Sequence, residues 1–162
     1  MTFSGFELMA PSQRRYVAVE TVISMVINTL ISVGFVYLAF GGTGWIATAA
    51  LIPDALPQSF MIALMGTIVP ALLTRKRMRA GIVDGLDRQV PKLLRSLPAL
   101  ALLVAFVAAI AGLAVHAAVL INFAPNGLSF GTALAFKAIF GGMLAGIVTL
   151  ATLPLALAER SA

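Results

Sequence analysis

Four long apolar stretches alternate with polar segments along the chain. They run Val17–Phe40, Pro57–Thr74, Leu97–Ile121 and Thr132–Leu157. A helix needs about 20 residues to cross a hydrocarbon layer roughly 30 Å thick, and only the second stretch is near the lower limit of this range. We therefore predict an all-α fold, an integral membrane bundle of four transmembrane helices, forming a single membrane domain over residues 1–162.

The composition excludes a water-soluble domain. Hydrophobic residues make up 60% of the chain and charged residues only 10%, whereas about a quarter of a soluble chain is charged. Too few polar side chains are present to cover a globular core. The absence of cysteine also excludes disulfides, thiol nucleophiles and thiolate metal sites.

Basic residues are concentrated on one side of the predicted membrane. The expected outer loops, 41–56 and 122–131, contain no Lys or Arg, and Lys137 is the only basic residue on that side. Because Lys and Arg crowd the cytoplasmic flanks of membrane helices, we expect both termini and the loop 75–96 in the cytoplasm. The net charge of +5 then indicates attraction to anionic headgroups rather than to nucleic acid. The expected headgroup contacts are Arg75, Lys76, Arg77, Arg79, Arg88, Lys92 and Arg95.

The loop 75–96 also carries an apolar pattern. Apolar residues recur at nearly helical spacing, at Ile82, Val83, Leu86 and Val90 and again at residues 93 and 94. This pattern predicts an amphipathic segment lying at the cytoplasmic membrane surface. A solvated connector is the alternative.

A short motif occurs twice. Ser59-Phe60-x-x-Ala63-Leu64 recurs as Ser129-Phe130-x-x-Ala133-Leu134. It suggests two duplicated helical hairpins related by an axis along the membrane normal, although chance in so apolar a chain is the alternative.

Small residues line faces of the third and fourth predicted helices. Ala138, Gly142 and Gly146 share one face, and Gly112 continues an alanine face on the third helix. Close packing of small residues drives helix association in lipid. We expect these two faces to meet, within the chain or between protomers, with packing inside the chain as the simpler interpretation.

Several polar residues fall in the outer half of the predicted bundle. Ionisable groups inside a membrane mark candidate functional sites. The lysine of this outer polar cluster would favour an anion, or its charge would be neutralised by the aspartate of the cluster. Its histidine could carry a proton, although a hydrogen bond within the bundle is the simpler role. The members are Asp54, Gln58, His116, Asn122 and Lys137.

A second polar pattern follows the first predicted helix. Glu20, Ser24, Asn28 and Ser32 recur at every fourth position and form a polar stripe along one face. The stripe could line a pathway. Hydrogen bonds between helices, worth about 0.6–2 kcal/mol each, are the alternative.

Motifs for enzymatic chemistry are absent from the sequence. It has no His-x-x-x-His or Glu-x-x-His spacing for a metal, no phosphate-binding glycine loop and no Gly-x-Ser-x-Gly turn. We therefore expect no catalytic residue, no metal and no cofactor.

One segment resembles a known family. The run Asp54-Ala-Leu-Pro57-Gln58-Ser59-Phe60-Met61, followed by Val69-Pro70 and Thr74-Arg75-Lys-Arg77, is similar to an uncharacterised bacterial family of small four-helix membrane proteins. The resemblance lies mainly in residues 54–81. It implies the bacterial inner membrane and transfers no activity or binding residue.

Two functional hypotheses follow from these patterns. The first is a non-catalytic helper or accessory subunit that packs against other membrane proteins or copies of itself through its small-residue faces. The second is a small oligomeric transporter or channel for a neutral or anionic small molecule, using the polar stripe and the outer polar cluster.

Overall fold

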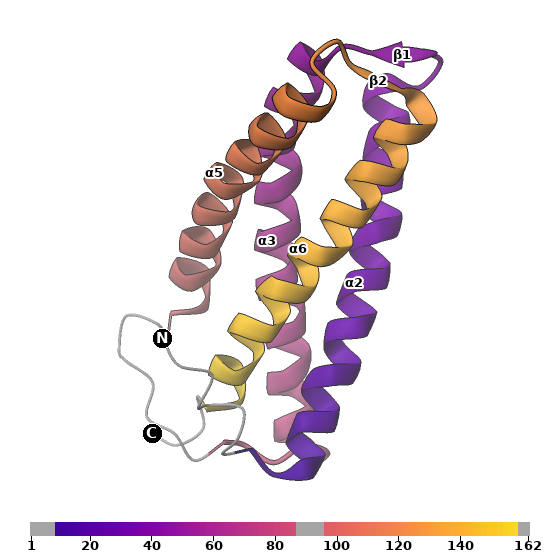
Figure 1. Ribbon diagram of the computed structural model, residues 1–162. Helices are drawn as coiled ribbons and strands as arrows, with labels where there is room; N and C mark the ends of the chain where they lie inside the picture. The colour runs from indigo at the N-terminus through magenta and orange to yellow at the C-terminus, as the bar shows by residue number, and fades with distance from the viewer. Residues whose placement is uncertain (1–8, 87–95, 159–162) are drawn as a thin grey trace.

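Four long helices and two short strands make up the described part of the chain. The computed structural model describes residues 9–86 and 96–158. Each helix is long and apolar enough to cross a membrane, so the predicted four-helix membrane bundle is confirmed. In chain order the elements are α2 (Pro11–Phe40), β1 (Trp45–Ile46), α3 (Thr48–Arg79), α5 (Leu97–Phe123), β2 (Leu128–Ser129) and α6 (Phe130–Ala158) (Figure 1).

Helix α3 is longer at both ends than the sequence predicted. It begins at Thr48, so Pro53 and Pro57 lie inside the helix and not before it. The prediction was wrong because it placed Pro57 in the first turn of the helix, whereas membrane helices also tolerate interior prolines. The helix continues through Arg79, which shortens the expected loop 75–96.

The predicted amphipathic segment lies partly outside the described residues. Residues 81–86 form turns, bends and irregular backbone rather than helix. Residues 87–95 lie outside the described part of the chain. The apolar pattern does bring Leu86 into the bundle, where its N–H donates to the Leu157 carbonyl at 2.8 Å and its side chain packs with Val17 and Met78.

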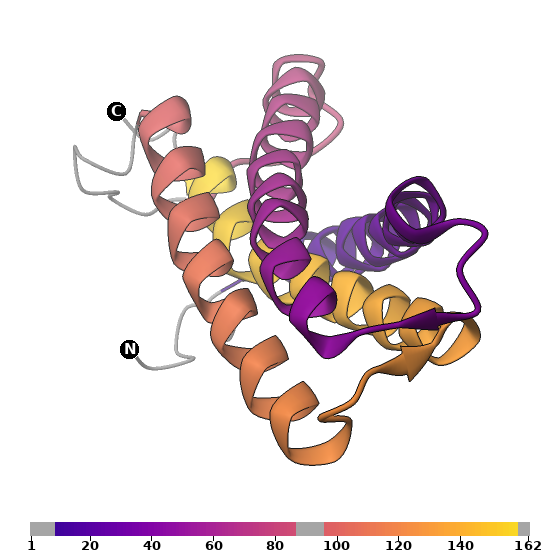
Figure 2. The same cartoon turned by 90° about the horizontal axis from the view of Figure 1, so that it is seen from above.

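The two hairpins, α2 with α3 and α5 with α6, are interlocked. Helices α3 and α6 pack against each other at the centre of the bundle, while α2 packs mainly on α6 and α5 mainly on α3 (Figure 2). Each flanking helix therefore packs against the central helix of the other hairpin and has few contacts with its own partner.

A two-stranded sheet joins the hairpins at one end of the bundle, which we call the β end. Strands β1 and β2 are antiparallel, with Trp45 opposite Ser129 and Ile46 opposite Leu128. The Trp45 indole N–H donates to the Asn126 carbonyl at 3.2 Å. The opposite end, where α2 begins and α6 finishes, is called the basic end (Figure 1).

The hairpins are related by approximate two-fold symmetry with a spacing of 83 residues. Phe40 ends α2 and Phe123, 83 positions later, ends α5. The strand register gives the same relation, because an antiparallel pair is two-fold symmetric and therefore equates Trp45 with Leu128. The pattern of helix contacts is also unchanged when the hairpins are exchanged.

The structure supports a hairpin repeat but not the motif that suggested it. The motif pairs Ser59 with Ser129, which are 70 positions apart. Ser59 is buried within α3, whereas Ser129 lies in β2. At the structural spacing Ser59 corresponds to Gly142, so the repeated letters do not occupy equivalent positions.

The outer surface of the bundle is apolar. Leu30 on α2, Ile110 on α5 and Ile147 on α6 are each more than 60% exposed. Exposed apolar side chains on membrane-spanning helices contact lipid, so the bilayer is the medium that surrounds these faces.

Candidate functional site

A buried ion pair lies at the centre of the bundle, in the half nearer the β end. Lys137 on α6 has a fully buried side chain, and its Nζ donates to Oδ2 of Asp54 on α3 and to Oε1 of Gln58 at 2.9 Å. The Asp54 side chain is 24% exposed. Since a buried ammonium is costly unless it is paired and hydrogen-bonded, these two partners account for the burial of Lys137.

Gln58 extends the ion pair to a third helix. Its Nε2 donates to Oγ of Ser32 on α2 at 3.1 Å and contacts the Lys137 carbonyl oxygen at 3.4 Å. Three members of the predicted outer cluster, Asp54, Gln58 and Lys137, therefore lie in contact with one another. They form a network that connects α2, α3 and α6.

His116 lies near this network but is not hydrogen-bonded to it. Its side chain is fully buried, and Nδ1 lies 2.9 Å from the Gly112 carbonyl on its own helix. Its ring makes edge contacts with Phe136 and Phe140, the residues on either side of Lys137 along α6, at centroid separations of 4.9 and 4.4 Å.

Asn122 does not join the cluster. It is exposed on α5, and its Nδ2 donates to the Ala118 carbonyl of the same helix at 2.7 Å. Its expected place in a shared outer pocket was therefore wrong. The residue lies in the last turn of α5.

The predicted polar stripe on α2 is buried along its whole length. Ser24 accepts a hydrogen bond from Oγ1 of Thr149 on α6 at 2.9 Å. Asn28 donates to the Ser24 carbonyl at 2.8 Å, and Ser32 accepts from Gln58. At a similar depth on α3, Thr67 donates to the Ala63 carbonyl of its own helix. The stripe therefore supplies contacts between helices.

A second ion pair occupies the basic end of the stripe. Glu20, which is buried, pairs with Arg77 on α3. Arg77 also donates to the Tyr16 hydroxyl at 3.2 Å, and that hydroxyl lies 2.8 Å from Oγ1 of Thr74. The stripe thus runs between two ion pairs, one toward each end of the bundle.

The small-residue faces of α5 and α6 pack mainly against other helices and not against each other. A Cβ added at Gly112 would overlap the Ser59 side chain on α3, and one at Gly142 would lie 2.5 Å from Oγ1 of Thr29 on α2. These two contacts are equivalent under the 83-residue relation. Gly146 similarly approaches Met25 on α2, while Ala138 is half-buried.

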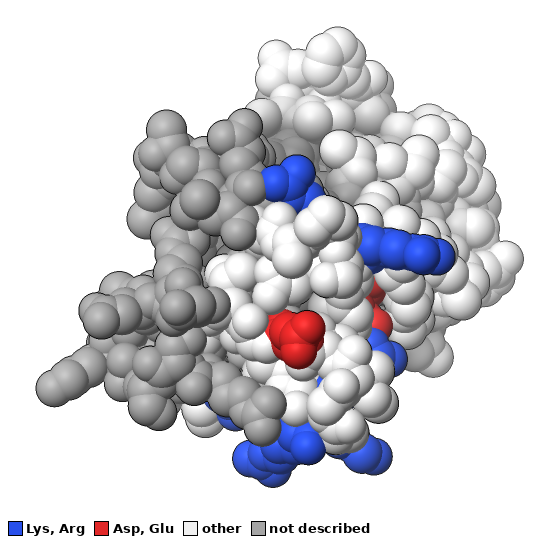
Figure 3. Space-filling view, turned by 90° about the horizontal axis from the view of Figure 1, so that it is seen from below, with Lys and Arg blue, Asp and Glu red and all other residues white. Residues whose placement is uncertain are grey.

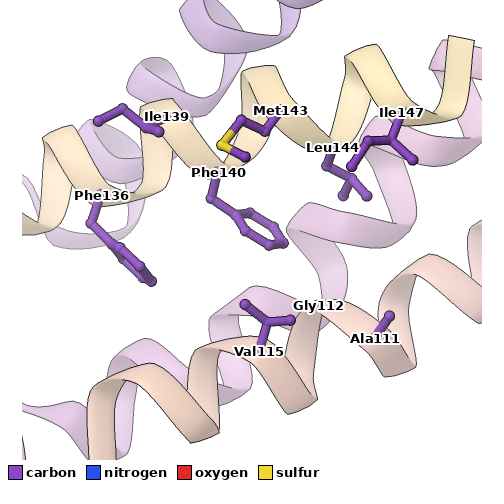
Figure 4. Close-up of a pocket in the computed structure, with 9 residues that line it drawn as sticks. All are labelled: Ala111, Gly112, Val115, Phe136, Ile139, Phe140, Met143, Leu144 and Ile147. Carbon is purple, nitrogen blue, oxygen red and sulfur yellow. The ribbon is translucent and has the colours of Figure 1, made fainter. Parts of the chain in front are cut away.

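The space left between α5 and α6 is an apolar cavity, which we call the α5–α6 cavity. It has a volume of about 510 Å³. Figure 4 shows Phe136 and Phe140 pointing from α6 toward α5, where Ala111, Gly112 and Val115 form the opposite wall. The sequence did not predict this cavity, because the small-residue faces of these two helices were expected to pack against each other.

Basic side chains surround the basic end of the bundle (Figure 3). Arg15, Lys76 and Arg79 are exposed there, and Arg75 and Arg77 are half-buried. The other predicted headgroup contacts, Arg88, Lys92 and Arg95, lie outside the described residues.

The described residues contain no group of three His, Cys, Asp or Glu side chains that could hold a metal. No protein-family model, curated protein or solved structure matches the chain. The similarity of residues 54–81 to a bacterial family therefore gains no further support. The identification rests on the chain itself: it is an integral membrane protein with four spans packed as a helical bundle.

Proposed function

We propose that this protein is a non-catalytic accessory subunit of the bacterial inner membrane, which binds other membrane proteins through its lipid-facing helices. The observation that carries the proposal is that the polar groups inside the membrane bind one another within the chain. Lys137 is bound by Asp54 and Gln58, Glu20 pairs with Arg77, and Ser24 is bound by Thr149. These groups stabilise the bundle, which leaves its apolar outer surface for contact with a partner.

The charge distribution supports an orientation with the basic end in the cytoplasm. Exposed Arg15, Lys76 and Arg79 at that end match the usual flank of a cytoplasmic membrane surface. Anionic headgroups would bind there at about 1 kcal/mol per basic residue.

Isolation of the intact complex tests the accessory role. The tagged protein is expressed at its native level, extracted in mild detergent, and the complex mass is measured together with its composition. We expect a mass above 16.9 kDa with a second membrane protein in fixed stoichiometry. A monomer, or an assembly of this chain alone, would contradict the accessory role.

The partner interaction should also depend on a particular outer face. Met143→Trp changes an exposed residue of α6, and Val26→Trp changes a residue with nearly the same exposure on α2, 57% against 55%. We expect one of these variants to release the partner while the other retains it. Release by both, or by neither, would argue against binding through a defined helix face.

A transporter is the second candidate, and the polar stripe supports it. Buried polar groups run from Glu20 through Ser24 and Asn28 to Ser32, with an ion pair at each end. Solute flux into vesicles that contain the purified protein, sensitive to Asn28→Leu and insensitive to Val26→Leu, would support this candidate over the accessory role.

A further inference from the structure

The α5–α6 cavity lies on the lipid-facing side of the bundle. Ile139, Met143 and Ile147 form its α6 edge, and each is more than half exposed. The residues that line the cavity carry no charged or polar side chain. Its volume of about 510 Å³ falls within the range of small-molecule sites, about 300–1,000 Å³. An uncharged, membrane-soluble molecule could therefore enter it from the bilayer.

Two side chains, those of Ser59 and Phe140, meet beside Gly112 at the inner wall of the cavity. A Cβ placed on Gly112 would overlap the hydroxyl of Ser59 and would lie 3.3 Å from Cζ of Phe140. The Ser59 hydroxyl and the tip of the Phe140 ring therefore lie beside the same point of α5. Only a glycine at position 112 leaves room for both.

Two buried polar atoms near this wall have no partner among the described residues. They are Ser59 Oγ and His116 Nε2. The Gly112 carbonyl can only accept a hydrogen bond, so His116 Nδ1 donates to it, and Nε2 of the neutral ring is left as an acceptor. Leaving such an atom buried and unpaired destabilises the fold, so these two atoms require an explanation.

Phe140 separates these atoms from the cavity. Its ring lines the cavity, lies 4.4 Å from the His116 ring between centroids and reaches the point beside Ser59. Rotation of this one side chain would connect an apolar cavity with a hydroxyl and an acceptor nitrogen.

We propose that the α5–α6 cavity binds an uncharged lipophile with a hydroxyl head, of the alkyl hydroquinone type. The apolar part fills the cavity, and the Phe140 ring turns aside to admit the head. The ligand hydroxyl donates to Nε2 of His116 and accepts from the Ser59 hydroxyl. This proposal does not rest on the accessory role, because ligand binding is measured on the chain without a partner.

Direct binding tests the proposal on the full chain in lipid nanodiscs. The probe is radiolabelled dodecylhydroquinone, and the comparison ligand is dodecylbenzene, which has the same chain and ring but no hydroxyl. We expect saturable binding of one hydroquinone per chain, at least ten-fold tighter than dodecylbenzene. Equal affinity for the two ligands, or no saturable binding, would overturn the proposal.

Variants test the apolar cavity and the buried polar atoms behind Phe140 separately. Ala111→Phe fills the cavity from an exposed position and should abolish binding, whereas Val107→Phe, one turn away on the exposed surface of α5, should not. His116→Phe should reduce hydroquinone affinity about ten-fold without changing dodecylbenzene affinity. Phe140→Ala should strengthen binding. Unchanged binding in both Ala111→Phe and His116→Phe would overturn the proposed site.

Discussion

Asp54 and Lys137 occupy equivalent positions in the two hairpins and form an ion pair with each other. They are 83 residues apart, the same spacing that relates Phe40 to Phe123. Two identical charged residues at these positions would place like charges together inside the bundle. The opposite charges therefore favour association of the first hairpin with the second, and disfavour association of either hairpin with a copy of itself.

Removing one partner of this ion pair should be more damaging than removing both. Asp54→Leu leaves the fully buried Lys137 ammonium without its carboxylate, a change that costs about 3–5 kcal/mol when a buried pair is broken. The double variant Asp54→Leu/Lys137→Met removes the unpaired charge and should recover most of that loss. The measurement is the free energy of unfolding in detergent.

Asp84→Leu is the control for this cycle, because it also removes a carboxylate, but an exposed one. It should change the free energy of unfolding by no more than about 0.5 kcal/mol. If the double variant were as unstable as Asp54→Leu alone, the pair would not be the source of the effect.

The contact between Gly142 and Thr29 gives a second prediction. Alanine is favoured over glycine in a helix by about 1 kcal/mol, but a Cβ at position 142 would lie 2.5 Å from Thr29 Oγ1. Overpacking of this kind costs about 1–3 kcal/mol, so Gly142→Ala should lower the thermal unfolding midpoint.

Thr29→Ala removes the obstructing hydroxyl, so the double variant Thr29→Ala/Gly142→Ala should be more stable than Gly142→Ala alone. Gly34→Ala is the matched control, because nothing lies within 4 Å of its added Cβ, and it should be neutral or stabilising. A loss of stability at Gly34 equal to that at Gly142 would show that contact with α2 is not the cause.

The proposed orientation predicts the behaviour of topology reporters. Alkaline phosphatase folds only outside the cytoplasm, so a fusion after residue 162 should be inactive. Insertion at Thr43, between α2 and β1, should be active. The opposite result would place the basic end outside the cytoplasm and overturn the orientation.

Hydropathy and charge were sufficient to predict the spans, because burial in lipid demands long apolar helices. The pairing of Asp54 with Lys137 was one of two alternatives that the sequence left open, the other being an anion held by Lys137. The start of α3 at Thr48 was not predicted, because Pro53 and Pro57 resemble helix boundaries in sequence while neighbouring helices allow them inside.

Which helices pack together could not be read from the sequence. The small-residue faces of α5 and α6 were expected to meet each other, whereas Gly112 packs against α3 and Gly142 packs against α2. The 83-residue relation was hidden because equivalent positions hold different residues, such as Asp54 and Lys137 or Ser59 and Gly142. The α5–α6 cavity remains because these faces pack against other helices and not against each other. The sequence therefore did not predict it.

A disulfide between α2 and α6 tests the interlocked arrangement most directly. The chain contains no cysteine, so Thr29→Cys/Gly142→Cys introduces the only possible bridge. A Cβ at position 142 lies 3.8 Å from that of Thr29, within the usual range of about 3.5–4.5 Å for a disulfide. A protease site inserted within residues 87–95 then allows the two hairpins to be separated.

Val26→Cys/Phe106→Cys is the control, because both positions are exposed on α2 and α5, two helices that do not pack closely. After oxidation and cleavage, the Thr29→Cys/Gly142→Cys protein should migrate at full length on a non-reducing gel and split into two fragments on reduction. The control should split under both conditions. Separation of the Thr29→Cys/Gly142→Cys fragments without reductant would contradict the interlocked fold.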